Sequence, residues 1–364
     1  MKILLCTNQY DTISNGPARF ANLISQFGDQ DIRVLSEDIV RDSTRLYRLE
    51  MPLWVRRGKC SQFFRMILYH KKAMTIRKNF PFDFLVYNHA LVGIWSAIWF
   101  KNTVGMFNDD SYVSFSFSNN PFNGSWVKKT VFRQIEKLMY RICDKVIVNS
   151  EYLKMKLLTE YGKRENVYRL YKGIPLPENA CKPDQSLRPQ ILFIKKDYKT
   201  GGLINLIQAL QRVSFEFNLH IVGPGTDDFP EIQGWLSKAK ILDITTMHGY
   251  KEPSEIAALI KKASVFCVPS KREALGIANI EALANGIPVV STNVGGIPEV
   301  LDNGKNGWMA NPGNSLQLAG MLDECMQKPA LRNQKIERGL VFVKRFSVSV
   351  MYHEFLRILS VNSK

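Results

Sequence analysis

The chain has 364 residues, of which 45% are hydrophobic and 23% are charged. This composition excludes a disordered chain, a collagen and a coiled coil, and the length favours two domains. Basic residues outnumber acidic ones by 49 to 33, and 27 of the basic against 16 of the acidic residues lie in positions 1–180. The excess favours a polyanionic partner of the first half, such as nucleic acid, anionic lipid or a phosphate-rich substrate.

The cysteines and the apolar runs exclude further classes of protein. The six cysteines lie far apart and no Cys/His group has zinc spacing, so we expect reduced thiols, no metal and a cytoplasmic protein. The apolar start of the chain stops at Thr7, too early for a secretory signal. Asn88 and His89 interrupt the most apolar stretch, Phe84–Phe100, which we predict to be a buried strand and a buried helix rather than a membrane span.

Short β-branched runs alternate with helical patterns along the whole chain, which predicts parallel sheets with crossover helices. In the first half the predicted strands are Lys2–Cys6, Ile32–Ser36, Phe84–Tyr87, Thr103–Phe107, Lys145–Asn149 and Val167–Tyr171. In the second half they are Gln190–Ile194, Phe217–Val222, Asp243–Met247, Ser264–Val268, Pro288–Thr292 and Trp308–Ala310. Two such sets predict an α/β chain with two doubly wound, Rossmann-like domains.

The domain boundary is marked by prolines. The stretch 172–190 contains four of them and has no apolar periodicity, which is typical of an interdomain linker. Ligands of doubly wound sheets bind at the carboxyl ends of the strands, so we expect both domains to place these ends around one cleft. The predicted parts are an N-terminal domain at 1–172, a linker at 173–189, a C-terminal domain at 190–345 and a helix at 346–364 that packs back on the N-terminal domain.

The segment after the strand Ser264–Val268 carries the most informative motif. Glu273 and Glu281 stand eight residues apart, with a glycine turn and the start of a helix between them. On the loop, Glu273 is able to accept hydrogen bonds from hydroxyl groups, whereas Glu281 on the helix is able to hold both hydroxyls of a ribose. The helix N-terminus between them favours a phosphate, and its residues are Leu275, Gly276, Ile277 and Ala278. The alternative is a surface helix with two solvated glutamates.

This segment resembles the nucleotide-sugar site of glycosyltransferase family 4, whose members are retaining enzymes with the GT-B fold. The resemblance rests on the two glutamates, the run Gly286–Val290 and the Gly-Gly-Ile-Pro-Glu turn at 295–299, in this order and spacing. It implies that Glu273 contacts the hydroxyls of the donor sugar and that Glu281 holds the nucleotide ribose. It also implies that the amides around Gly276–Ala278 meet the diphosphate, and that neither a metal nor a separate cofactor is needed. By the same resemblance the N-terminal domain at 1–172 binds the acceptor and the C-terminal domain at 190–345 binds the nucleotide-sugar.

The second domain opens with a strand that ends in a lysine-rich loop. In the family an arginine follows this strand and a lysine comes a few residues later, and both hold the diphosphate. Lys196 matches the arginine, but Gly201 stands at the lysine position, so Lys199 is the expected substitute. A cation is needed because the leaving diphosphate gathers negative charge in the transition state. Loops at Gly223 and Tyr250 resemble family loops around the nucleotide base.

The first domain begins with a strand, a small-residue loop and a helix. The family usually has Gly-Gly in this loop, where this chain has Asn15-Gly16. Gly16 is therefore our candidate contact of the donor phosphate. Arg19, in the first helical turn, faces either phosphate or solvent.

A second candidate group follows the strand Thr103–Phe107. Many family members have a histidine there, close to the donor sugar, whereas this chain has Asn108 followed by Asp109 and Asp110. Either aspartate is a candidate for orienting the acceptor hydroxyl, and the alternative is that it caps the next turn. His89, after another strand, is a candidate cleft residue.

Two stretches, Met51–Phe80 and Trp126–Arg141, combine basic and aromatic residues. The first holds eight basic residues and no acidic one, and its part Ser61–Asn79 has a helical stripe of Phe63, Ile67, His70 and Met74. Such stretches suit an anionic membrane surface; the alternative is that two surface helices pack their aromatic residues inward. No helix-turn-helix, RNP or zinc-finger pattern occurs, so we expect no nucleic-acid partner.

Together these observations predict a retaining, metal-independent hexosyltransferase that moves a sugar from a nucleotide-diphosphate donor to a membrane-associated glycan or lipid-linked acceptor. We expect it to act in surface polysaccharide synthesis, such as that of O-antigen or capsule. We also expect it to be cytoplasmic and peripherally associated with the inner face of the membrane. The alternatives are a sugar-nucleotide epimerase or phosphorylase of the same fold, a family member without activity and a basic nucleic-acid-binding protein.

Overall fold

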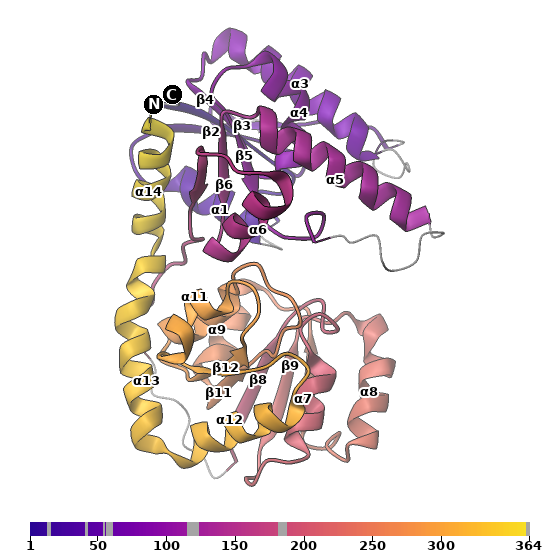
Figure 1. Ribbon diagram of the computed structural model, residues 1–364, viewed down its shortest axis with the longest axis vertical. Coiled ribbons are helices and arrows are strands. Elements are labelled where there is room, and N and C mark those ends of the chain that lie inside the picture. Colours follow the sequence, from indigo (N-terminus) through magenta and orange to yellow (C-terminus); the bar gives the residue numbers. More distant parts are fainter. Residues whose placement is uncertain are drawn as a thin grey trace. The chain divides into compact units, whose positions relative to one another are not determined.

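In the computed structural model the chain forms two α/β units (Figure 1). Unit 1 comprises Met1–Gly173 and Val348–Lys364, and unit 2 comprises Ile174–Ser347. The structure describes residues 1–12, 16–40, 43–53, 55, 61–114, 124–180 and 188–361, without the side chains of 124–126.

Unit 1 is built on a parallel sheet with the strand order β3-β2-β1-β4-β5-β6-β7 among the described residues. Alternate side chains of β1 point to opposite faces: Ile3 and Leu5 meet α1 and α14, whereas Leu4 and Cys6 meet α3. The strands are β1 (Lys2–Thr7), β2 (Asp31–Ser36), β3 (Leu46–Arg48), β4 (Phe84–Tyr87), β5 (Thr103–Phe107), β6 (Lys145–Val148) and β7 (Val167–Arg169). The helices are α1 (Gly16–Gln26), α3 (Ser61–Asn79), α4 (Ile94–Trp99), α5 (Gly124–Ile142), α6 (Glu151–Tyr161) and α14 (Val348–Ser360), with a 3₁₀ turn at Ala90–Gly93.

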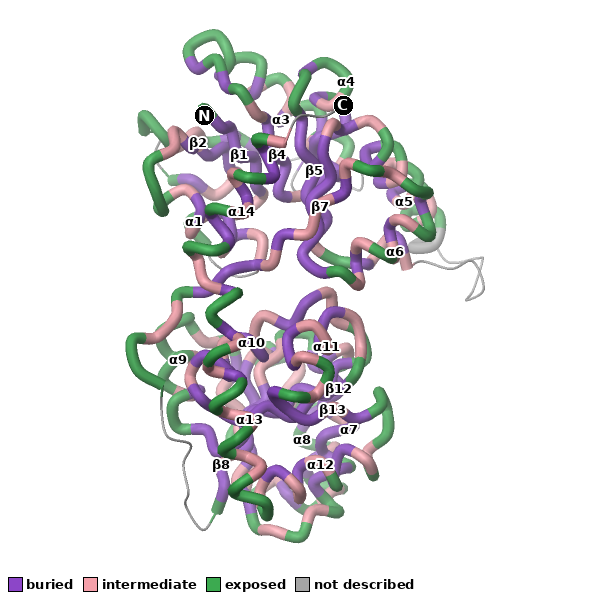
Figure 2. The backbone as a smooth tube through the Cα atoms, turned by 60° about the vertical axis from the view of Figure 1, so that its left-hand side comes forward, coloured by how far each residue is buried: buried purple, intermediate pink, exposed green. Residues whose placement is uncertain are grey.

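Unit 2 contains a second parallel sheet, with the order β10-β9-β8-β11-β12-β13 in the described part of the chain. Its strands are β8 (Gln190–Ile194), β9 (Asn218–Val222), β10 (Thr245–Gly249), β11 (Val265–Cys267), β12 (Val289–Thr292) and β13 (Trp308–Ala310). Its helices are α7 (Leu203–Leu210), α8 (Phe229–Lys238), α9 (Pro253–Lys261), α10 (Ile277–Ala284), α11 (Ile297–Val300), α12 (Ser315–Gln327) and α13 (Pro329–Phe342), with 3₁₀ turns at Thr226–Asp228, Asp302–Gly304 and Val343–Phe346. The strands are largely buried in both units (Figure 2), as parallel sheets covered on both faces require.

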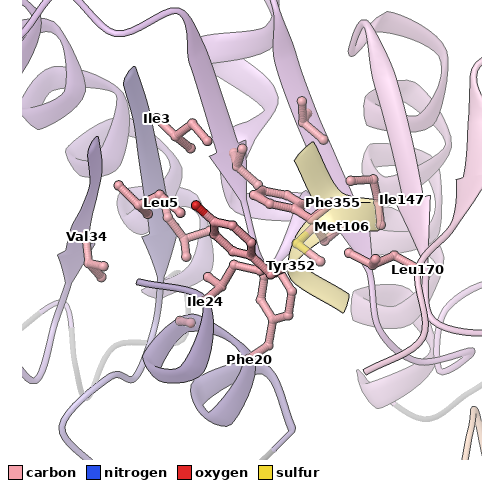
Figure 3. Packing of buried hydrophobic residues seen from close by; sticks show 14 of the residues in the cluster. Ile3, Leu5, Phe20, Ile24, Val34, Met106, Ile147, Leu170, Tyr352 and Phe355 are labelled. Atoms are coloured by element: carbon pink, nitrogen blue, oxygen red, sulfur yellow. The ribbon is translucent and has the colours of Figure 1, made fainter. Parts of the chain in front are cut away.

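Helix α14 returns to unit 1 and is part of its core. Phe355 and Tyr352 lie among side chains of α1 and of several strands (Figure 3), and the Phe355 ring meets the Phe20 ring edge-on with centroids 5.8 Å apart. The Lys145 ammonium donates hydrogen bonds to the carbonyls of Leu359 and Val361 at the end of the helix. Unit 1 is therefore completed by residues from the far end of the chain.

The chain leaves and re-enters unit 1 at adjacent points. The Ile174 amide donates to the Phe346 carbonyl at 2.8 Å, and Ile174 forms a parallel bridge with Ser347. The predicted boundaries at 172/173 and 345/346 fall next to these crossings.

The two Rossmann-like sheets predicted from the sequence are confirmed, and each predicted strand overlaps an observed one. The short strand β3 was not predicted, because its Leu-Tyr-Arg sequence has no apolar run. The prediction of a buried helix at the end of Phe84–Phe100 is wrong. Only one side of α4 packs inward, which leaves Trp95, Ile98 and Trp99 exposed by 45%, 57% and 72%.

Candidate functional site

The loops that follow β8, β9 and β11 in unit 2 pack against one another. The Lys271 amide donates to the Thr200 carbonyl at 2.8 Å, which joins the loop after β11 to the loop after β8. Gly223, directly after β9, lies so close to the backbone of Lys195 that a Cβ atom there would come within 2.8 Å of the Lys195 carbonyl oxygen. The carboxyl ends of three strands thus form one site, as expected for a doubly wound sheet.

Backbone contacts fix the position of Glu273. The Gly296 amide donates to the Glu273 carbonyl at 3.3 Å. Gly295 has a φ of +57°, and a Cβ atom on it would overlap the Glu273 carbonyl oxygen. A glycine is required at position 295 for both reasons, so the Gly-Gly turn positions the peptide that carries the Glu273 side chain.

Helix α10 begins beside Glu273. Its N-cap is Gly276, and the first amides belong to the half-buried Ile277 and Ala278. The first N–H groups of a helix have no acceptor within the helix, so this end favours an anion. The predicted Glu281 lies one turn further along and is half-buried, and Leu275 is buried beneath the turn.

The lysines of the 195–202 loop differ in their environments. The Lys195 ammonium lies 2.5 Å from Glu273 Oε2, and the two side chains are 27% and 20% exposed. The predicted Lys196 is exposed, and the predicted Lys199 is 60% exposed and forms an ion pair with Glu231 at 2.8 Å. The hydrogen bond to Glu231 raises the pKa of Lys199. Lys195 was missed by the sequence analysis, because only the position next to it matched the family pattern.

The two loops that are predicted to surround the nucleotide base, at Gly223 and Tyr250, lie beside the lysine-rich loop. The Gly223 amide donates to the Gly249 carbonyl at 2.8 Å, which ties the end of β9 to the end of β10. Tyr250 follows at once and is 52% exposed. Both predicted residues are therefore at the carboxyl edge of the same sheet.

In unit 1 the predicted residues gather at the corresponding edge of the first sheet. Gly16 is the first residue of α1, and Arg19 lies half-buried in its first turn. Asn88, at the end of β4, donates to the Pro17 carbonyl at 2.6 Å. Asn108, at the end of β5, donates to the Asn88 carbonyl, so a short chain of amides links both strand ends to the start of α1.

A small pocket of about 50 Å³ opens at this edge. Burial lowers the pKa of His89 and raises the pKa of Glu136 to about 8. Glu136 accepts a hydrogen bond from the Tyr161 hydroxyl at 2.7 Å. Residues that line the pocket are Pro17, His89, Ala90, Leu91, Met106, Phe107, Asn108, Asp109, Tyr112 and Glu136.

The two predicted aspartates have different surroundings. Asp110 is only 2% exposed, and its Oδ2 accepts from Ser114, Tyr152 and Lys156 at 2.6, 3.0 and 3.2 Å. It therefore anchors α6 to the loop after β5. Asp109 accepts from the Ser111 amide at 2.8 Å, as in the capping alternative, and its side chain also borders the pocket.

The two basic helices of unit 1 differ in how their aromatic and apolar residues are buried. Helix α3 buries Met66, Tyr69, Ala73 and Ile76, whereas Phe63, Ile67 and Met74 of the predicted stripe are 42%, 39% and 51% exposed. Helix α5 buries Phe132 and Tyr140, in line with the inward-packing alternative. Trp54, residues 56–60 and the side chain of Trp126 lie outside the described residues. In the part of the chain that the structure describes, no helix combines the length and hydropathy of a membrane span.

Comparisons with known proteins show what the chain is similar to. Residues 182–340 match the model of the family described as Glycosyl transferases group 1. The chain is 29% identical over 214 residues to an uncharacterized glycosyltransferase of Methanocaldococcus jannaschii, and the match spans 56% of each chain, little more than half of that relative's length. It is 24% identical over 371 residues to an uncharacterized 41.2 kDa protein in the cps region of Klebsiella pneumoniae, covering 96% of this chain and 97% of the relative. Among solved structures, Alr3699/HepE of Anabaena in complex with UDP and glucose superposes with a TM-score of 0.76 at 17% identity over 100% of both chains.

Proposed function

We infer that this chain, in which residues 182–340 match the model of Glycosyl transferases group 1, transfers a sugar from a nucleotide-diphosphate donor to a glycan or lipid-linked acceptor. The observation that carries the proposal is the arrangement in unit 2: a helix N-terminus for the diphosphate, with Glu273 beside it and Glu281 one turn further. The UDP and glucose named with the Anabaena structure favour a uridine donor as the first to test.

We further propose that the reaction is metal-independent and retains the anomeric configuration. The bond between the sugar and the diphosphate breaks, the acceptor hydroxyl attacks from the same face, and its proton passes to the leaving phosphate oxygen. The ion pair between Glu273 and Lys195 supports this route, because the Lys195 ammonium occupies the Oε2 atom of the Glu273 carboxylate and the route does not use this carboxylate as the base. Lysines and the α10 N-terminus stabilise the negative charge of the leaving group.

A donor panel tests the proposal. UDP-, GDP- and dTDP-sugars are compared for slow hydrolysis and for thermal stabilisation of the full chain. A donor at a hundredfold excess over its Kd is expected to stabilise the fold by about 2.7 kcal/mol. Glu281→Ala, the matched control, should lose this stabilisation while unfolding at the same temperature without ligand. If no donor stabilises or is hydrolysed, the proposed function is wrong.

We propose that the acceptor is reached at an anionic membrane surface, in surface polysaccharide synthesis. Helix α4 packs against both α3 and α5 (Figure 1) and exposes Trp95, Ile98 and Trp99. The neighbouring helices add exposed basic residues, namely Lys71, Arg77, Lys78, Lys128, Lys129 and Arg141. Exposed tryptophans on one helix and basic residues on the helices that adjoin it suit the boundary between lipid head groups and acyl chains. The relative in the cps region supports the assignment to polysaccharide synthesis.

Vesicle binding tests the membrane part separately. Trp95→Gln/Trp99→Gln is expected to lower binding to vesicles with anionic phospholipid at least tenfold, and high salt should release the wild-type protein. A matched control replaces Leu316 and Val341, which are 71% and 70% exposed in unit 2, and should bind as wild type. Equal binding of all three proteins would contradict the membrane proposal without touching the donor site.

A further inference from the structure

The Lys195 side chain occupies the space that a side chain at position 201 would need. A Cβ atom on Gly201 would lie 2.7 Å from Lys195 Cγ, 2.9 Å from Lys195 Cβ and 2.9 Å from the ring of Phe193. The backbone at Gly201 does not have a positive φ, so its conformation does not require glycine. The lack of a side chain at position 201 is what makes room for the Lys195 side chain.

The Lys195 side chain uses this room to reach Glu273. Its amide continues the pairing of β8 by donating to the Val222 carbonyl at 3.0 Å, which fixes the start of the side chain. Its ammonium ends 2.5 Å from the Glu273 carboxylate, beside the N-terminus of α10. An ammonium has three protons to donate, so one bond to Glu273 leaves donors for an anionic ligand.

The other two lysines of the loop are less suited to this position. Lys199 is paired with Glu231, which also accepts from the Tyr198 hydroxyl at 2.6 Å. Lys196 is exposed at the surface of the loop. Among the described lysines of this loop, Lys195 is the one whose ammonium contacts the donor-site glutamate.

We propose that Lys195 binds the donor diphosphate in place of the lysine that the family has at position 201, and that the small Gly201 makes room for it. This inference rests on the proposed function and names the residue that meets the second phosphate. In the absence of ligand, Glu273 holds the ammonium in place. When a nucleoside diphosphate binds, the ammonium shares its donors between Glu273 and a phosphate oxygen.

The test compares nucleoside diphosphates with monophosphates. Affinities of the full chain for UDP and UMP, GDP and GMP, and dTDP and dTMP are measured by calorimetry. Lys195→Met keeps the aliphatic stem over Gly201 but removes the charge, so we expect the diphosphate affinity to fall at least tenfold while the monophosphate affinity stays within twofold. An equal loss for both ligands, or no loss, would overturn the proposal.

A double variant tests the shared space directly. Gly201→Lys alone should lower diphosphate affinity, because its side chain collides with that of Lys195. Lys195→Gly/Gly201→Lys moves the lysine to the position that is its neighbour in space. This variant should bind the diphosphate at least tenfold more tightly than Lys195→Gly. If the double variant binds the diphosphate no better than Lys195→Gly and unfolds at the same temperature, the proposal that a lysine at either position does the same work is wrong.

Two controls separate this inference from the proposed function. Glu281→Ala should weaken diphosphate and monophosphate binding alike, because the ribose is common to both ligands. If the wild-type chain binds no diphosphate at all, both the proposed function and the role of Lys195 are wrong. If it binds one and Lys195→Met binds it equally well, only the role of Lys195 is wrong.

Discussion

The candidate sites of the two units are built in different ways. In unit 2 the site depends on close backbone contacts, such as that of Gly295 with the Glu273 carbonyl. In unit 1 the pocket depends on buried side chains that titrate, above all His89 and Glu136. An added atom should therefore disrupt the first site, whereas a change of pH should act on the second.

The largest expected effect comes from adding one methyl group to the turn in unit 2. Gly295→Ala should lower the free energy of unfolding by roughly 3 kcal/mol or more, since it combines a strained backbone with an overlap. Gly313→Ala is the matched control: its φ is +78°, but no atom of the described residues lies within 4 Å of the added Cβ, so about 1 kcal/mol is expected. Chemical denaturation measures both. Similar losses would mean that strain alone, and not the fit against Glu273, matters.

Substitutions of the two donor-site glutamates, Glu273 and Glu281, should affect different steps of the reaction. Glu273→Ala is expected to lower turnover about a hundredfold, because its contact with the sugar strengthens as positive charge develops. Glu281→Ala should instead weaken nucleotide binding, because ribose is bound equally in the ground and transition states. Steady-state kinetics and calorimetry separate the two effects. Equal losses of nucleoside diphosphate affinity would contradict this division.

Glu136 should make the stability of unit 1 depend on pH. Its folded-state pKa of about 8 lies above the ordinary value of 4.5, so the native state binds more protons between these values. The free energy of unfolding should therefore fall as pH rises from 5 to 8, by up to about 1.4 kcal/mol per pH unit.

Glu136→Gln should flatten that slope and be relatively more stable at pH 8. Glu160→Gln, which changes a carboxylate that is 41% exposed and paired with Arg133, serves as the control and should keep the slope. Denaturation curves at several pH values decide the matter. A slope that survives in Glu136→Gln would assign the pH dependence to other groups.

The smallest effect is expected from Lys199. Its ion pair with Glu231 is exposed, so Lys199→Ala should change neither stability nor diphosphate affinity measurably. Lys196→Ala should cost more in turnover, since Lys196 matches the family arginine. A larger loss in Lys199→Ala would show that the loop changes its conformation when the donor binds.

A feature of the structure could be predicted from the sequence where it depends on residues that are close together in the chain. The strands follow from short β-branched runs, and the motif from Glu273 to Glu281 follows from its own spacing. Lys195 and Glu136 were missed because their roles depend on residues distant in sequence: Lys195 meets Glu273, and Glu136 meets Tyr161. On its own helix Glu136 has the pattern of a solvated glutamate among basic residues. The exposed side of α4 was missed because an apolar run does not reveal that only one of its faces is covered.

The path of the chain has a consequence for how the protein is made. Ile174 and Ser347 lie side by side, and α14 completes the core of unit 1. Topologically, unit 2 is an insertion into unit 1. During synthesis from the N-terminus, unit 2 has all of its residues before α14 emerges, so the domain that starts first is the last to close. Until then the surface that Phe355 and Tyr352 cover is open, and a chain truncated after residue 347 would keep it open permanently.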